Sequence, residues 1–305
     1  MRTSETVIEK HGYRVTILNR NTARVEDIGA GVLPHTVTIR KLLGQGDANP
    51  KTAKNKVPTM GLSLLPERGV KIGNLCPMAK TCVKACLAHQ GQGPVPSVKA
   101  SRAAKSILWF LAREWFLDKL DRELTTFRKR HKGTVGVRLN MFSDIRWEDH
   151  GVIDQHPDIQ FYDYTKLPGR HGAVRPNYWV TLSYDGTNRA AAIAALHSGH
   201  NVSAVFHNFD GKCGKAAHRQ ELPKSFLGFP VIDGGETDWR PGDARGVIVG
   251  LRLLARTYAS RNEAIGSKFS TPTETANDRE LLPPLESDSL VIEATDGKPL
   301  QLVIA

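Results

Sequence analysis

The stretch from Tyr178-Trp-Val-Thr-Leu-Ser183 to Asn201-Val-Ser-Ala-Val-Phe206, with the alanine-rich segment Asn188 to His197 in its middle, decides the fold class. Its two ends are short and mostly apolar or β-branched, which is typical of buried strands. The alanine-rich segment predicts a helix, and Gly199 after it is a common signal for a helix C-terminus. Two strands joined by a helical crossover form a parallel βαβ unit, so the sequence predicts an α/β protein.

Short apolar segments on both sides of this unit predict further strands of the same sheet. They are residues 60–65, 134–140, 159–166, 229–233 and 246–251. Between the first two, apolar residues recur at three- and four-residue steps from 98 to 131, which predicts one long amphipathic helix. Polar residues follow successive strands, and in a barrel these positions gather on one face. We therefore predict a TIM-like parallel barrel, complete or partial.

Two segments of different character flank the predicted barrel. Residues 1–58 form an N-terminal extension of β-strands and loops, with strand patterns at 13–18 and 36–40. Residues 59–258 form the barrel domain. Residues 259–305 form a loose tail, rich in Ser, Thr, Pro and acidic residues, that ends in a pattern compatible with a β-hairpin.

The composition points to a globular protein rather than a membrane protein. Hydrophobic residues make up 40% of the chain and charged residues 24%, and no apolar run reaches the roughly 18 residues of a spanning helix. The first residues lack the apolar core of a signal peptide, so we expect a reducing cytoplasm. The formal net charge of +11 permits binding of nucleic acid or of an anionic small molecule.

Two basic segments have both a structural and a functional interpretation. The loop Gly44 to Lys54 has small residues and lysines that can hold a phosphate or carboxylate, but it lacks the pattern of a P-loop. The run Arg128-Lys-Arg-His-Lys132 complements the end of a helix and also suits a nucleic-acid backbone. Without a binding role, the loop Gly44 to Lys54 would be a basic surface loop, and the run Arg128 to Lys132 would be a solvated helix end.

Three of the four cysteines lie in the segment Asn74 to Leu87, at a Cys-x5-Cys-x3-Cys spacing. Cysteines clustered in one loop of a cytoplasmic protein favour a metal or cluster site, so we predict an iron–sulfur cluster on Cys76, Cys82 and Cys86. Zinc is the alternative, although structural zinc sites usually pair two short knuckles. Cys213 either supplies a fourth ligand or leaves one iron open for a small molecule.

A second group of polar residues follows the predicted strands, and we predict that it lines a polar pocket beside the cluster. The candidates are Ser143, Asp144, Glu148, Tyr162, Asp163, Thr165, Lys166, Asp233, Asp238 and Arg240. For any one of them, the alternative is ordinary hydrogen bonding at a strand end or loop cap.

Several of these motifs together resemble a family of bacteriophage proteins known as a numbered gene product. The shared motifs are Asn74-Leu-Cys-Pro to Cys86-Leu87, Asn140-Met-Phe-Ser-Asp144 with Trp147-Glu148, Phe161-Tyr-Asp-Tyr-Thr-Lys166, Asn177-Tyr178, and Val231-Ile-Asp-Gly234 with Asp238 and Arg240. The resemblance spans roughly residues 44 to 251. It implies a phage origin, a shared site and a location in the host cytoplasm during infection, and it implies no particular reaction.

A weaker resemblance is to the radical SAM enzymes, in which a partial barrel holds a [4Fe-4S] cluster in the loop after its first strand. The similarity lies in the cysteine loop after residues 60–65. This resemblance implies S-adenosylmethionine bound at an open iron. The cysteine spacing differs from that superfamily's usual Cys-x3-Cys-x2-Cys.

These observations lead to one main functional expectation. We expect a phage protein that holds a [4Fe-4S] cluster and binds an unidentified small molecule beside it. The sequence leaves open whether the protein is an enzyme, either radical-SAM-like or another iron–sulfur enzyme. The alternative is a basic nucleic-acid-binding phage protein with a structural cluster or a zinc site. No membrane partner is expected.

Overall fold

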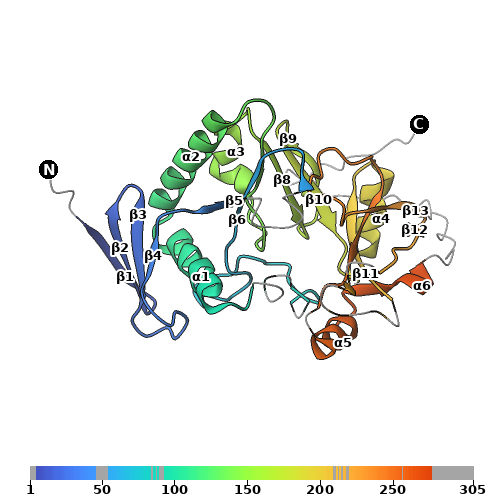
Figure 1. Ribbon diagram of the computed structural model, residues 1–305, viewed down its shortest axis with the longest axis horizontal. Helices are drawn as coiled ribbons and strands as arrows, with labels where there is room; N and C mark the ends of the chain where they lie inside the picture. The colour runs from blue at the N-terminus through green and yellow to red at the C-terminus, as the bar shows by residue number, and fades with distance from the viewer. Residues whose placement is uncertain are drawn as a thin grey trace, which may run out of the picture.

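The structure is a computed structural model that describes residues 5–45, 54–83, 85–86, 88, 93–208, 211, 213, 216–217, 220–255 and 257–276. Within these ranges the chain forms two β-sheets, with helices packed on them (Figure 1). A small antiparallel sheet comes first, and a larger, mostly parallel sheet follows it. This arrangement confirms the α/β class.

The small sheet is a meander in the order β1-β2-β3-β4. Its strands are β1 Thr6–Lys10, β2 Tyr13–Asn19, β3 Thr22–Asp27 and β4 Val37–Ile39. Tyr13 and Val15 of β2 and Ala23 and Val25 of β3 are buried, because alternate side chains of each strand point to the same face. That face packs against the first helix, which therefore lies between the two sheets (Figure 1).

The large sheet has the order β12-β13-β14-β11-β10-β8-β7-β6-β5, with β9 on β10 and β15 on β11. Its strands are β5 Leu43–Gln45, β6 Thr59–Leu62, β7 Gly136–Arg138, β8 Gln160–Thr165, β9 Gly172–Arg175, β10 Tyr178–Ser183, β11 Val202–His207, β12 Ser225–Phe226, β13 Phe229–Asp233, β14 Ile248–Arg252 and β15 Ser270–Pro272. The path from β6 through β7, β8, β10, β11 and β14 to β13 is parallel throughout. Each strand predicted from the sequence for this sheet is present.

The predicted TIM-like barrel, complete or partial, is not confirmed, because the described strands do not close into a barrel. In the part of the chain that the structure describes, β12 pairs only with β13 and β5 only with β6, both antiparallel, so the two ends of the sheet do not join. Barrel closure depends on how far strands tilt and stagger around the sheet, and a local apolar pattern does not encode that. What the structure shows is an open α/β sheet with parallel central strands.

The helices are α1 Pro96–Leu111, α2 Arg113–Arg130, α3 Val152–Gln155, α4 Arg189–His197, α5 Tyr258–Gly266 and α6 Thr273–Ala276, with a 3-10 turn at Trp147–His150. The long helix predicted for 98–131 is two helices, because Ala112 leaves the helical conformation with φ −133° and ψ 51°. Neither glycine nor proline marks this break in the sequence. The two halves serve different partners: α1 packs on the small sheet, and Glu123 of α2 binds the segment before β5.

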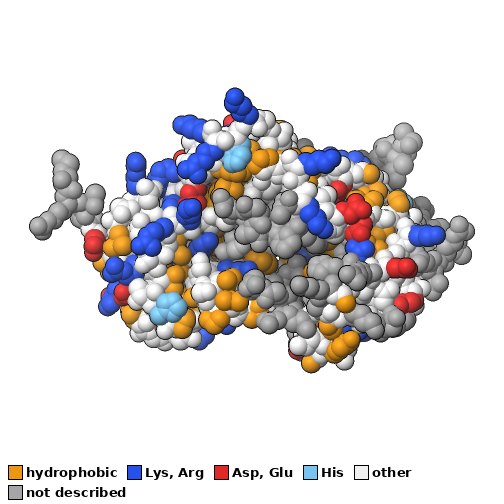
Figure 2. Space-filling view, viewed as in Figure 1, with side chains coloured by type: hydrophobic (Ala, Val, Ile, Leu, Met, Phe, Trp, Pro, Cys, Tyr) orange, Lys and Arg blue, Asp and Glu red, His pale blue; other side chains and the backbone are white. Residues whose placement is uncertain are grey.

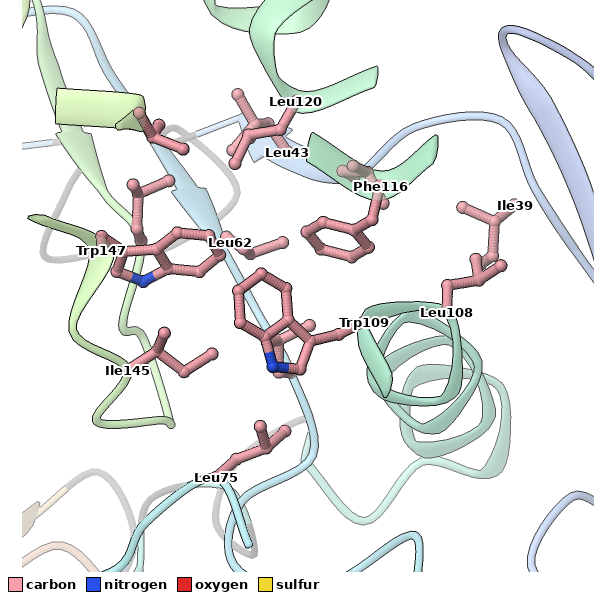
Figure 3. Close-up of a cluster of buried hydrophobic side chains, with 14 of the residues drawn as sticks. Ile39, Leu43, Leu62, Leu75, Leu108, Trp109, Phe116, Leu120, Ile145 and Trp147 are labelled. Atoms are coloured by element: carbon pink, nitrogen blue, oxygen red, sulfur yellow. The ribbon is translucent and has the colours of Figure 1, made fainter. Parts of the chain in front are cut away.

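The main core joins the helices to the large sheet (Figure 3). Trp109 of α1 and Trp147 of the loop after β7 lie with ring centroids 4.9 Å apart, and Phe116 of α2 packs edge-on to Trp109 at 5.5 Å. Leu62 from β6 lies beside them in Figure 3. Burying aromatic rings of this size is among the strongest stabilising contributions that a core can have. This cluster fixes α1 and α2 over β6 and β7.

The C-terminal part of the described chain adds α5, β15 and α6, and β15 pairs with β11. The proposed boundaries at residues 58 and 258 stay predictions. The hairpin pattern at 290–304 lies outside the described residues. In the ranges that are described, no helix combines the length and the apolar character needed to cross a membrane.

Candidate functional site

Arg170 is the centre of a buried ion network at the carboxyl ends of β7 and β8. Its guanidinium donates two hydrogen bonds to Glu148, at 2.7 and 2.9 Å, and one to Asp144 at 3.1 Å. Asp144 also accepts hydrogen bonds from the Thr165 hydroxyl at 2.8 Å and from the Lys166 backbone N–H at 2.8 Å. Burial alone acts to raise the pKa of Glu148, but Arg170 outweighs burial and holds that pKa below its usual value. Four predicted site residues thus meet here, largely occupied with one another.

Asn140 organises the loop that carries Ser143 and Asp144. Its side-chain oxygen accepts hydrogen bonds from the Ser143 hydroxyl, the Ile145 N–H and the Trp147 indole, at 2.8, 3.0 and 3.1 Å. Its side-chain amide donates to the Ile145 carbonyl at 2.9 Å. One buried side chain therefore closes the loop on itself. This contact explains why asparagine, rather than an apolar residue, follows the end of β7.

Asp163 of β8 is fully buried beneath this network. Its carboxylate accepts hydrogen bonds from the Asn140 backbone N–H and from the Tyr178 hydroxyl, both at 2.8 Å. Burial raises the pKa of Asp163 to about 7, even though these donors and Arg138 act to lower it. The folded protein therefore takes up a proton here at a pH where an unfolded chain has already lost it.

The raised pKa of Asp163 predicts that stability falls as pH rises. The unfolded carboxyl titrates near 3.8 and the folded one near 7, so the folded state binds more protons in this window. Raising the pH from 5 to 8 should therefore lower the free energy of unfolding by about 2–3 kcal/mol through this single group. In Asp163→Asn that part of the pH dependence should disappear, as measured by urea unfolding at both pH values. The exposed Asp158→Asn is the control and should keep the wild-type slope; equal slopes in all three proteins would contradict the assignment.

The opposite face of the sheet carries a separate polar group. Neighbouring residues of a strand point to opposite faces, so Tyr162 lies on the other side of β8 from Asp163. Asp238 pairs there with the buried Arg138, at 2.7 Å, and its carboxylate also accepts a hydrogen bond from the Tyr162 hydroxyl at 3.4 Å. Arg240, 1% exposed, pairs with Asp243 at 3.0 Å. The predicted pocket residues are therefore divided between two faces.

Asp233 lies apart from both groups, at the end of β13. Arg252 of β14 holds it through two hydrogen bonds, at 2.7 and 2.8 Å. This bidentate pair ties neighbouring parallel strands together near one end of the sheet. Cys213 is half-buried in the segment after β11. The polar pocket formed by all ten candidates stays a prediction.

The predicted iron–sulfur cluster is wrong for the described residues, and so is the alternative zinc site. Among the residues whose placement is described, which include Cys76, Cys82, Cys86 and Cys213, no three or more Cys, His, Asp or Glu side chains form a group that could hold a metal ion. The Cys76 thiol instead donates to the Phe142 carbonyl at 3.2 Å. Burial raises the pKa of this thiol to about 12, so it is neutral in the metal-free protein. The S-adenosylmethionine expectation depended on an open iron of this cluster, and it stays an untested prediction.

The cysteine loop has a structural role at the carboxyl ends of the parallel strands. Thr81 donates its hydroxyl to the Asp185 carbonyl at 2.6 Å, and the Asp144 N–H donates to the Leu75 carbonyl at 2.7 Å. These bonds attach the loop to the carboxyl ends of β10 and β7. The metal-ligand chemistry that we inferred from the spacing of the cysteines is wrong for the described residues.

A basic pocket lies elsewhere, where α2, the start of β6 and the segment before β5 meet. Its volume is about 1020 Å³. The cationic side chains in its lining are Arg40, Lys41, Lys119 and Arg130, together with His131. Glu123 is the one carboxylate among the lining residues that the structure describes. Figure 2 shows that Lys and Arg side chains gather mainly over the half of the molecule that carries β1–β4 and α2.

Glu123 holds the rim of this pocket in place. It accepts backbone hydrogen bonds from Leu42 and Leu43, at 2.8 to 3.0 Å, and pairs with Lys119 at 2.8 Å. The Lys105 ammonium donates to the Leu42 carbonyl at 2.7 Å from α1. The backbone next to Arg40 and Lys41 is therefore clamped by two helices. The Glu123 charge is used inside the protein, so it does little to oppose an anion in the pocket.

Described residues at the two ends of the first basic segment, Gly44 and Asn55, line this pocket together with Arg130 and His131 of the second. Sequence reasoning treated the two as unrelated, and it missed Arg40, Lys41, Lys119 and Glu123. The i,i+4 spacing of Lys119 and Glu123 on one helix was a signal for their pairing, but no local pattern showed what the pair holds.

The fold and this site define an α/β protein with an open, largely parallel sheet and a cationic pocket. The chain belongs to the Gene product 88 family, a family of numbered phage gene products whose model matches residues 40–266. This match confirms the phage resemblance, and it covers the Arg170 network and every described lining residue of the pocket except Asn21. The radical SAM resemblance finds no support. No curated protein and no solved structure matches the chain.

Proposed function

We propose that this phage protein binds nucleic acid through its basic pocket. The observation that carries the proposal is the convergence of Arg40, Lys41 and Arg130 on one concavity. These side chains make no ion pair with any residue that the structure describes, and they come from segments about 90 positions apart in the chain. Cations with no ion-pair partner among the described residues attract phosphate groups and release the counterions bound to them.

The distribution of charge around the pocket supports the same partner. Lys54, Lys56 and Lys132 are exposed neighbours of lining residues, and the whole chain carries a net charge of +11. Clustered positive charge on one region of a basic protein is the usual electrostatic signature of nucleic-acid binding. We place this activity in the cytoplasm of the infected host, where phage and host nucleic acids are present.

We call Arg40, Lys41 and Arg130 the rim cations. Replacing all three should weaken binding of a labelled oligonucleotide. In the triple variant Arg40→Ala, Lys41→Ala, Arg130→Ala, we expect affinity at 50 mM salt to fall by at least about tenfold. The slope of log affinity against log salt should become shallower by about 2, because each phosphate contact to a single strand contributes about 0.7. Fluorescence anisotropy over a salt series measures both quantities.

A matched control removes the same charge from other surfaces. Lys10, Lys99 and Arg175 lie on β1, α1 and β9, outside the pocket. Their combined replacement by Ala should leave the salt slope within about 0.5 of the wild type, since only contacted phosphates contribute to it. If the two triple variants lost affinity and salt slope equally, binding would depend on net charge alone, and the pocket would not be the binding site. No binding by the wild type at 50 mM salt would overturn the function itself.

A further inference from the structure

We infer that the basic pocket takes single-stranded nucleic acid, with a base inserted against an apolar floor. This inference rests on the proposed function and specifies its ligand. The lining of the pocket combines cations with apolar side chains, which we call its floor: Leu43, Val57, Pro58, Met60 and Phe127. A site that contacted only phosphates would need the cations and would gain nothing from the floor.

The shape of the site favours a single strand over a duplex. Proteins read B-form DNA by placing a protruding helix or β-ribbon in a groove. Here the cations surround a cavity of about 1020 Å³, so the ligand has to protrude into the protein. A duplex presents phosphates outside and keeps its bases stacked within, whereas a single strand can turn an unstacked base outward.

The floor has the chemistry that a base requires. The Phe127 and His131 rings lie with centroids 4.8 Å apart, and the His131 ring is oriented by a hydrogen bond from its Nδ1 to the Phe127 carbonyl at 3.0 Å. Leu43 and Phe127 are 3% and 7% exposed, so they support the floor from beneath. The apolar surface open to a base comes from Val57, Pro58 and Met60, which are partly or well exposed. Bases stack on aromatic and apolar surfaces with little sequence preference, because each base has an apolar face. The site therefore suits single strands of varied sequence.

Met60 is the floor residue that can be changed with the best control. It lies on β6, and its neighbour Gly61 faces the other way, where a side chain would meet the Met141 sulfur. Met60→Gln makes the floor polar without changing charge or length. Met141→Gln makes the same chemical change on the opposite face of β6.

The test compares a fluorescein-labelled 15-nucleotide DNA strand of mixed sequence with its duplex at 50 and 200 mM salt. The wild type should bind the single strand at least about tenfold more tightly than the duplex, which is the scale of one stacked base. Met60→Gln should reduce this preference by about fivefold or more and leave duplex affinity unchanged, and Met141→Gln should keep the wild-type preference. Val57→Ser replaces Met60→Gln if that variant fails to fold, as judged by circular dichroism.

The outcomes separate this inference from the proposed function. Salt-dependent binding with equal affinity for strand and duplex would overturn the inserted base and leave nucleic-acid binding intact. A full single-strand preference in folded Met60→Gln would likewise overturn the assignment of the base to this floor. Absence of binding to both probes would overturn the proposed function, and the inference would fall with it.

Discussion

Replacing Arg170 with Met is expected to lower the free energy of unfolding by about 3–5 kcal/mol, the largest effect that we expect from any single substitution. The Arg170 side chain is 1% exposed and lies between Glu148 and Asp144, whose side chains are 3% and 11% exposed. Methionine matches the aliphatic part of arginine but supplies no donor. Asp144 would then be buried without its cation, and Glu148 would keep only a longer contact, 3.9 Å, with the exposed Arg146. That penalty is far larger than the value of an exposed ion pair.

The control for this prediction is Arg175→Met. Arg175 pairs with Asp154 at 3.2 Å, but both side chains are well exposed, at 40% and 56%. Its loss should cost under about 1 kcal/mol in the same urea titration. The cost of Arg170→Met should also shrink toward pH 4, because protonation neutralises the stranded carboxylates. A cost below about 1 kcal/mol at pH 7, or one that does not change with pH, would contradict the assigned role of Arg170.

Replacing Glu123 with Ala is expected to cost about 3 kcal/mol of stability and to loosen the rim of the pocket. Lys119 is 3% exposed and would lose its only ion-pair partner among the described residues, at 2.8 Å. The N–H groups of Leu42 and Leu43 would lose their acceptor. Amide hydrogen exchange at these two residues should therefore accelerate, even under conditions in which the variant remains fully folded.

Asp118→Ala tests whether this effect is specific. Asp118 lies on the same helix and also forms an i,i+4 pair, with Arg122, but its side chain is 60% exposed. Its replacement should change stability by about 0.5 kcal/mol or less and leave exchange at Leu42 and Leu43 unaltered. If Glu123→Ala behaved like Asp118→Ala, Glu123 would not be the residue that holds the rim.

The cysteine motif illustrates where sequence reasoning went wrong. A short spacing brings thiols into one loop, and it carries no information about whether their sulfur atoms face a common point. Cys76 is turned toward the Phe142 carbonyl, 66 positions away, and burial favours its neutral thiol. The sequence predicts that Ser143, Asp144 and Glu148 line a substrate pocket. In the structure they also make internal hydrogen bonds and ion pairs with Asn140 and Arg170 that support the loop.

The sequence by itself determined the α/β class, the positions of the parallel strands and the helix of the βαβ unit. These features depend on local periodicity and on glycine at a helix end, which neighbouring residues encode among themselves. Only the tertiary structure decided the rest: the open sheet, the break at Ala112, the division of the polar residues between two faces, and the basic pocket. Each depends on contacts between distant segments, such as Glu123 with Leu42 across 81 positions, and the free energy of such contacts comes from burial and charge pairing that no local pattern displays.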